Sequence, residues 1–133
     1  MRPTTKTFIN KLKKINLRGE YKGTNEMGAD LVCVYNKETM QTILIGIEDG
    51  SAHMFTCVIK PSEGFSESDI LKDINTMNLH SRYIKFHLDK NAVIAECYVM
   101  FNDFTMVDGC MSTLSLLIYN VNKYYVMLKE LYT

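Results

Sequence analysis

An Asp-Gly pair between two apolar runs constrains the fold of this chain more than any other feature of its sequence. Asp49-Gly50 separates TILIGIE (42–48) from AHMFTCVI (52–59), and both runs are rich in β-branched residues, which favour strands. Asp-Gly is typical of the type I′ turn, because both central residues of that turn take positive φ. We therefore expect the two runs to pair as an antiparallel hairpin, which Pro61 ends because proline has no N–H to donate.

Three further runs have the composition or the alternation of strands. LVCVY (31–35) precedes the hairpin, while YIKFHL (83–88) and AVIAECYVMF (92–101) flank a polar turn at 89–91. The last two runs alternate in the way of a half-buried antiparallel pair. Both faces of the run 92–101 are substantially apolar, so we expect another element to cover each side of it.

Three segments have the spacing of amphipathic helices. The first spans 4–17. The second has the clearest start, because Ser66 and Asp69 form an acidic capping box, and it ends near Asn78. The third begins near Asp108 and runs almost to the C-terminus. Its expected core positions repeat at intervals of three and four residues: Met111, Leu114, Ile118, Val121, Tyr125 and Leu128, widened by Cys110, Leu117, Tyr124 and Leu131.

The order of these elements predicts the fold class. Residues 18–28 (RGEYKGTNEMG) contain three glycines, have no apolar period and predict a flexible loop. The order is therefore α-β-β-β-α-β-β-α, without the βαβ repeat that builds a parallel nucleotide-binding sheet. It predicts a single α+β domain over 1–133, with helices packed against an antiparallel sheet.

The charge and hydropathy of the chain argue against two classes of protein. The chain has 15 basic and 15 acidic side chains in 133 residues, so its formal net charge is zero. Binding nucleic acid through the overall field of the protein needs an excess of positive charge. No stretch has the roughly 18 consecutive apolar residues of a membrane span, and residues 1–14 lack the apolar core of a signal peptide. We therefore expect a cytoplasmic protein that does not insert into membranes.

The C-terminal helix has more apolar residues than its core face requires. Four of them fall outside that face, interrupted by Lys123: Leu116, Tyr119, Val126 and Met127. Exposed apolar residues gathered on one surface mark interaction sites. These four residues are our candidate partner-binding surface, and a homodimer contact is the partner they predict first.

The N-terminal helix is basic. Lys11, Lys14 and Arg18 share one face beside the apolar stripe, and no acidic residue precedes Glu20. Such a helix can bind nucleic acid or an anionic surface, or it can simply pack its apolar side on the domain and leave the charges in water. This basic patch gives the alternative function.

The sequence contains no recognisable catalytic or metal-binding motif. The cysteines at 33, 57, 97 and 110 are widely spaced and form neither CxxC nor a Cys/His cluster, so they predict reduced core thiols rather than zinc ligands or disulfides. One nucleophilic alternative stays open, in which Cys110 at a helix start pairs with His80 or His87. We predict no cofactor, no metal and no enzymatic activity.

The chain resembles the YbjN family, whose fold is similar to that of the class I type III secretion chaperones. The resemblance is sharpest over 70–131. It rests on Ile74-Asn75 and Asn78 in the second helix, on the hairpin YIKFHLDKNAVIAECYVMF, and on Gly109 opening the long terminal helix. It implies a small cytoplasmic protein, often dimeric, with a chaperone-like or regulatory role, and it carries over no catalytic residue.

The sequence therefore predicts a non-enzymatic protein-binding module that acts as a homodimer. Binding of nucleic acid or an anionic surface through the N-terminal helix is the alternative, and nucleic acid is the less expected partner because the net charge is zero.

Overall fold

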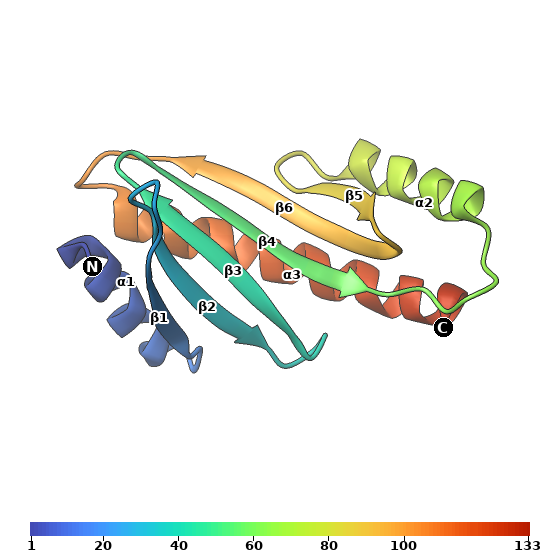
Figure 1. Cartoon of the computed structure of the whole chain (residues 1–133), viewed down its shortest axis with the longest axis horizontal. Helices are drawn as coiled ribbons and strands as arrows, with labels where there is room; N and C mark the ends of the chain where they lie inside the picture. The colour runs from blue at the N-terminus through green and yellow to red at the C-terminus, as the bar shows by residue number, and fades with distance from the viewer.

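Residues 1–133 are all described by the computed structural model, which has three helices and six strands (Figure 1). The elements in chain order are α1 (Pro3–Lys14), β1 (Gly19–Thr24), β2 (Asp30–Asn36), β3 (Gln41–Glu48), β4 (Ser51–Ile59), α2 (Glu67–His80), β5 (Lys85–Asp89), β6 (Ala92–Met100) and α3 (Met106–Tyr132). The strands form one sheet in the order β1-β2-β3-β4-β6-β5, and every neighbouring pair is antiparallel. The predicted α+β class is confirmed, with one strand more than the predicted order contained.

The extra strand is β1, so the prediction of a flexible loop over 18–28 is wrong for 19–24. This segment pairs with β2, where Gly19 lies opposite Val34. Its first glycine serves close packing rather than a loop, because a Cβ at Gly19 would lie 2.8 Å from Cδ1 of Leu12 in α1. A polar edge strand with glycine at a helix contact has no apolar period, and that is why its sequence pattern was that of a loop.

The expected hairpin between β3 and β4 is confirmed, but its turn type is not. Glu48 pairs with Ser51 across the turn, and Gly50 has a φ of 85° while Asp49 has no positive φ. The type I′ pattern occurs instead between β5 and β6, where Lys90 and Asn91 have φ values of 48° and 68°.

All three helices cover the same face of the sheet. Their buried side chains and the inward side chains of the strands form one continuous core, and Figure 1 shows α3 running behind the strands. The buried positions of α3 follow intervals of three and four residues: Met106, Cys110, Leu114, Leu117, Val121, Tyr124, Leu128 and Tyr132. Leu131 was expected in this core and is 49% exposed, because Tyr132 occupies the last core position. The Tyr132 ring packs edge-on against Phe65, and its hydroxyl donates to Asp73.

The start of α2 is as predicted, whereas α1 is capped from elsewhere in the chain. Ser66 Oγ accepts a hydrogen bond from the backbone N–H of Asp69, as the capping box requires. The first turn of α1 instead donates to Asp30 at the start of β2, from the backbone N–H of Arg2 and from Thr5 Oγ1, both at 2.7 Å. Asp30 is 1% exposed.

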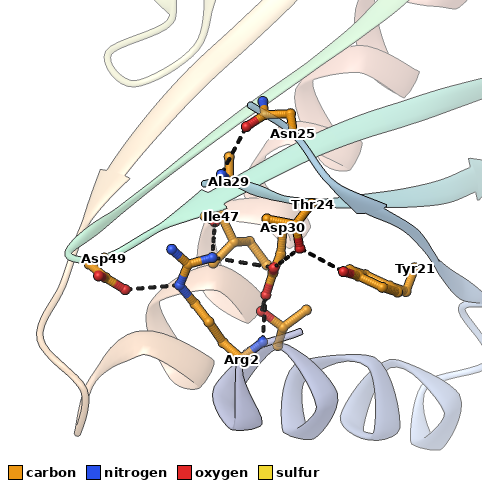
Figure 2. A network of polar contacts seen from close by, with 9 residues as sticks. Arg2, Tyr21, Thr24, Asn25, Ala29, Asp30, Ile47 and Asp49 are labelled. Carbon is orange, nitrogen blue, oxygen red and sulfur yellow. Dashed lines mark hydrogen bonds and ion pairs between the residues drawn. The ribbon is translucent and has the colours of Figure 1, made fainter. Parts of the chain in front are cut away.

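A polar network around Asp30 fixes one end of the sheet (Figure 2). Its carboxylate accepts a further hydrogen bond from Thr24 Oγ1 at 2.8 Å and lies 3.3 Å from the Arg2 guanidinium. Arg2 also donates to Asp49 Oδ1 at 2.9 Å and to the carbonyl of Ile47 at 3.0 Å. The network therefore joins α1 to the β1–β2 turn and the β3–β4 turn.

Candidate functional site

The face of the sheet opposite the helices has no cover. We call it the open face, and it is turned toward the viewer in Figure 1, in front of α3. The expectation that each side of 92–101 would be covered is wrong for the outer side, where Tyr98 is 68% exposed and Met100 is 87% exposed. The apolar and aromatic side chains of the open face come from four adjacent strands: Leu31, Leu44, Phe55, Tyr98 and Met100, with Cys33 between them.

A hollow lies at the centre of this face, at Gly46. The register places Gly46 between Leu31 of β2 and His53 of β4, so a side chain is missing from the middle of a row. The hollow has a volume of about 510 Å³, and Leu44, Phe55 and Tyr98 also line it. A Cβ built on Gly46 meets no atom closer than Leu31 Cδ2 at 4.0 Å, so the space above the glycine is free.

An aromatic wall borders the hollow on the β4–β6 side. The His53 ring stacks on Tyr98 with centroids 4.2 Å apart and planes inclined by 6°, and it also stacks on Phe55 at 5.3 Å. His53 Nε2 lies 3.1 Å from Glu96 Oε2, which fixes the orientation of the imidazole. The second carboxylate oxygen of Glu96 lies 3.9 Å from His87 Nδ1.

Sequence reasoning missed this arrangement. His53 and His87 are far apart in the sequence, and the pairing of β4 with β6 and of β6 with β5 brings both to one carboxylate, that of Glu96. The pairing of β4 with β6 has no local signal, because α2 and β5 separate these strands in the chain. A signal for the hollow did exist, since an isolated glycine inside a strand run indicates close approach or a missing side chain.

The chemistry of the open face suits binding rather than bond making. Most residues that line the hollow are apolar or aromatic, and the polar lining residues Lys22, Glu48 and Ser51 come from three different strands. Nowhere in the chain do three or more His, Cys, Asp or Glu side chains lie close enough together to hold a metal ion.

The thiol alternative from the sequence finds no geometric support. Cys110 is fully buried on the α3 side of the sheet, whereas His87 lies on the open face, so the sheet separates the two. His80 is exposed at the end of α2 and makes no hydrogen bond with the thiol. Burial raises the pKa of Cys110 to about 12, and burial together with the negative charge of Glu96 does the same for the pKa of Cys97. Both thiols are therefore protonated at neutral pH and poor nucleophiles.

The predicted partner surface on α3 lies on the side of the helix away from the sheet. Tyr119 and Val126 are each 67% exposed, and Leu116 and Met127 are each 36% exposed. Successive turns of α3 place them along one side of the helix. The structure thus gathers the four residues into one exposed stripe.

The predicted basic patch is only partly free. Lys11 Nζ lies 3.3 Å from Asp108 Oδ1, and Arg18 Nε lies 3.2 Å from Glu20 Oε1, so carboxylates neutralise two of its three members. Lys14 has no ion pair. None of the three helices combines the length with the apolar character that crossing a membrane requires.

Comparisons with known proteins show a likeness of fold. No family model matches the chain, and no curated protein matches it. Among solved structures, the chain is similar to the type III secretion chaperone SycH of Yersinia pestis, crystallised in complex with a stable fragment of YscM2. The TM-score is 0.47 with 18% sequence identity, over 85% of this chain and 96% of that chain. The similarity concerns the fold alone, and membership of the YbjN family stays a prediction.

Proposed function

We propose that this protein is a non-enzymatic protein-binding module, of chaperone-like or regulatory type, that holds an apolar segment of a partner on its open face. The observation that carries the proposal is the hollow at Gly46 with its apolar floor and aromatic wall. An antiparallel sheet with one solvated face normally alternates apolar-in with polar-out. Here several outward positions of the central strands are apolar or aromatic instead, among them Leu44, Phe55 and Tyr98, and a gathering of such residues marks an interaction surface.

A protein segment fits the open face better than a small molecule does. Small-molecule sites bury most of their ligand and orient it with a few convergent polar groups. This hollow is open to solvent, and its polar lining residues Lys22, Glu48 and Ser51 come from three different strands. Tyrosine and other aromatic side chains supply much of the binding energy in protein interfaces, and Tyr98 and Phe55 have that place here.

The acting form that we propose is a cytoplasmic homodimer. The exposed stripe on α3 supports self-association, and so does the resemblance to the YbjN family, in which dimers are common. The alternative function, contact with nucleic acid or an anionic surface through α1, loses support because Lys11 and Arg18 are paired with carboxylates. Charge reversal at Lys11, Lys14 and Arg18 tests it: retention on an anionic matrix at low salt that this variant abolishes would favour the alternative.

A substitution that fills the hollow tests the proposal directly. Gly46→Val places two methyl groups where the partner would lie, while its Cβ makes only ordinary contact with Leu31. Valine favours strands more than glycine does, so we expect the variant to be as stable as the wild type or more stable by about 0.5–1 kcal/mol. Loss of binding by this variant therefore cannot be attributed to unfolding.

The binding measurement uses a displayed library of random peptides, selected against the immobilised wild-type protein. We expect the selected peptides to contain a large apolar residue and to bind Gly46→Val at least tenfold more weakly. The matched control is Thr42→Val, which places a valine on the same strand and face but outside the hollow. Peptides that bind both variants like the wild type, or a library that yields no binders, would reject the proposal.

A further inference from the structure

The solvent side of α3 has a stripe with heptad spacing. Its members follow intervals of four, three, four, three and four residues: Ser112, Leu116, Tyr119, Lys123, Val126 and Glu130. We call these six residues the α3 stripe; Met127 borders it. The stripe lies opposite the buried side of α3, and all six side chains are exposed. Helices that pair with another helix carry apolar residues at this spacing, and here Leu116, Tyr119 and Val126 are apolar or aromatic while the other three members are polar.

We infer that the α3 stripe binds the α3 stripe of a second copy of the chain, with the two helices antiparallel and crossing near position 121. The inference rests on the proposed function, because it names the contact that makes the homodimer. It is carried by the order of residues along the stripe, which is complementary to itself when reversed.

In an antiparallel pair centred on position 121, each stripe residue faces a suitable residue of the second copy. Leu116 faces Val126 of the second copy, so apolar groups meet. Tyr119 faces Lys123 of the second copy, so an ammonium group lies at an aromatic ring. Ser112 faces Glu130 of the second copy, so a hydroxyl can donate to a carboxylate. Each pair occurs twice by symmetry, and no stripe residue is left without an opposite.

The central lysine already contacts an aromatic ring within its own helix. Lys123 Nζ lies 5.4 Å from the centroid of the Tyr124 ring in its own helix, so its ammonium group is held close to the helix surface. Tyr119, one turn earlier, is 67% exposed and presents its ring to the second copy. In the inferred pair, Lys123 can turn outward to the Tyr119 ring of the second copy, and a cation at an aromatic ring is a favourable polar centre for the contact.

Other alignments of the two helices are less complementary. A parallel pair places Lys123 against Lys123 and Glu130 against Glu130 of the second copy, which like charges disfavour. An antiparallel pair shifted by one layer toward the C-terminus sets Val126 against Lys123, and Leu116 then faces Thr133, the residue after the end of α3. A shift in the other direction leaves Val126 facing Gly109. Only the register about position 121 uses the whole stripe.

One helix from each copy makes a small interface. Stable protein interfaces bury about 1,200–2,000 Å², and a single pair of short helix segments gives less than this. We therefore expect a weak dimer whose population depends on concentration in the micromolar range.

Cysteine pairing in the full-length protein tests the register. Leu116→Cys and Val126→Cys variants are mixed under mild oxidation, with the wild type as background for the native thiols. A disulfide needs Cα atoms within about 7 Å, and in the inferred register the two copies of position 116 lie about 15 Å apart along the helices. We expect the mixed disulfide between positions 116 and 126 to form at least fivefold faster than either symmetric disulfide. A faster symmetric disulfide would overturn the antiparallel register.

The mass in solution tests the surface itself. We expect the wild type to shift toward a dimer with increasing concentration in sedimentation or light scattering, and Val126→Glu to stay monomeric. The matched control is Leu131→Glu, an exposed leucine of the same helix outside the stripe, which should dimerise like the wild type. A wild type that stays monomeric, or a Val126→Glu variant that still dimerises, would overturn the inference. Either result leaves the peptide test of Gly46→Val independent, so failure of the dimer contact is distinguishable from failure of the open-face site.

Discussion

The side-chain amide of Asn78, near the end of α2, makes two hydrogen bonds to the backbone of Phe86 in the edge strand β5. Asn78 Nδ2 donates to the Phe86 carbonyl, and Asn78 Oδ1 accepts from the Phe86 N–H, both at 2.8 Å. On its other side, Phe86 lies opposite Ala95 of β6. The amide therefore occupies the positions that a further strand would use, and this blocks pairing at that edge.

The substitution Asn78→Ala should both destabilise the protein and expose this edge. Two hydrogen bonds are lost, so we expect the free energy of unfolding in urea to fall by about 1–3 kcal/mol. We also expect faster aggregation at high protein concentration, because the β5 edge becomes free to pair. The matched control is Asn75→Ala, one turn earlier in α2, where the exposed asparagine side chain makes no hydrogen bond. Alanine is the better helix former, so we expect Asn75→Ala to be as stable as the wild type or slightly more stable. A loss in Asn78→Ala no larger than the change in Asn75→Ala would contradict the role of the edge contact.

Asp30 should make the stability of the protein depend on acid pH. Burial alone would raise the pKa of this carboxyl, but the hydrogen bonds from Arg2, Thr5 and Thr24 and the charge of Arg2 outweigh burial and lower the pKa to about 2. The unfolded chain has a pKa of 3.8 at this group, so the stabilisation is complete above about pH 4 and is lost as the pH falls through about 2. We expect the wild type to lose about 2 kcal/mol more than Asp30→Asn does over this range, measured by unfolding in urea at each pH.

A second carboxylate on the same arginine provides the control for Asp30. The Asp49 side chain is 95% exposed and also accepts a hydrogen bond from Arg2. We expect Asp49→Asn to change the free energy of unfolding by less than about 1 kcal/mol, because exposed ion pairs contribute little. If the wild type and Asp30→Asn followed the same acid profile, the ionised Asp30 would not be a source of stability.

The local part of this fold could be predicted from the sequence. Ser66 and Asp69 fixed the start of α2, and the apolar runs on either side of Asp49-Gly50 fixed the β3–β4 hairpin, because capping and turn formation depend on neighbouring residues. The edge strand β1 could not be predicted, since its stability comes from pairing with β2 and from the approach of α1 to Gly19.

The candidate site lay beyond sequence reasoning for a related physical reason. Gly46, His53 and Tyr98 form one row only through the pairing of β3 with β4 and of β4 with β6. The second pairing joins strands that are distant in the chain, and no turn between them fixes the register. The exposed residues of α3 could be predicted, because helical periodicity is a local property.

The four cysteines should react in two classes with a thiol reagent. Cys97 and Cys110 are buried with pKa values raised to about 12, so at about pH 8 almost none of either thiol is ionised. Cys33 and Cys57 are half-buried on the open face. We expect the folded protein to react at Cys33 and Cys57 first, and at the other two only on unfolding. In a Cys33→Ser, Cys57→Ser double variant, a thiol that reacts rapidly before unfolding would contradict the two classes, and it would support Cys110 as a nucleophile only if Cys110 rather than Cys97 is the residue labelled.

Tyr132 should make the attachment of α2 to the end of α3 sensitive to alkaline pH. Burial, the hydrogen bond to Asp73 and the negative charge of that carboxylate together raise the pKa of this phenol to about 12. The unfolded chain has a pKa of 10 at this group, so the neutral phenol stabilises the fold fully below about pH 10, and this stabilisation is lost as the pH rises toward 12.

Tyr132→Phe cannot ionise, and at neutral pH we expect it to lower the free energy of unfolding by about 1 kcal/mol because the hydrogen bond is lost. Between about pH 10 and 12, the free energy of unfolding in urea should fall by about 2 kcal/mol more for the wild type than for Tyr132→Phe. The control is Tyr83→Phe, at a tyrosine that is 71% exposed, and it should follow the wild type. Parallel profiles for the wild type and Tyr132→Phe would show that the phenol ionises as freely in the folded chain as in the unfolded chain, and the contact with Asp73 would then have no part in holding α2 to α3.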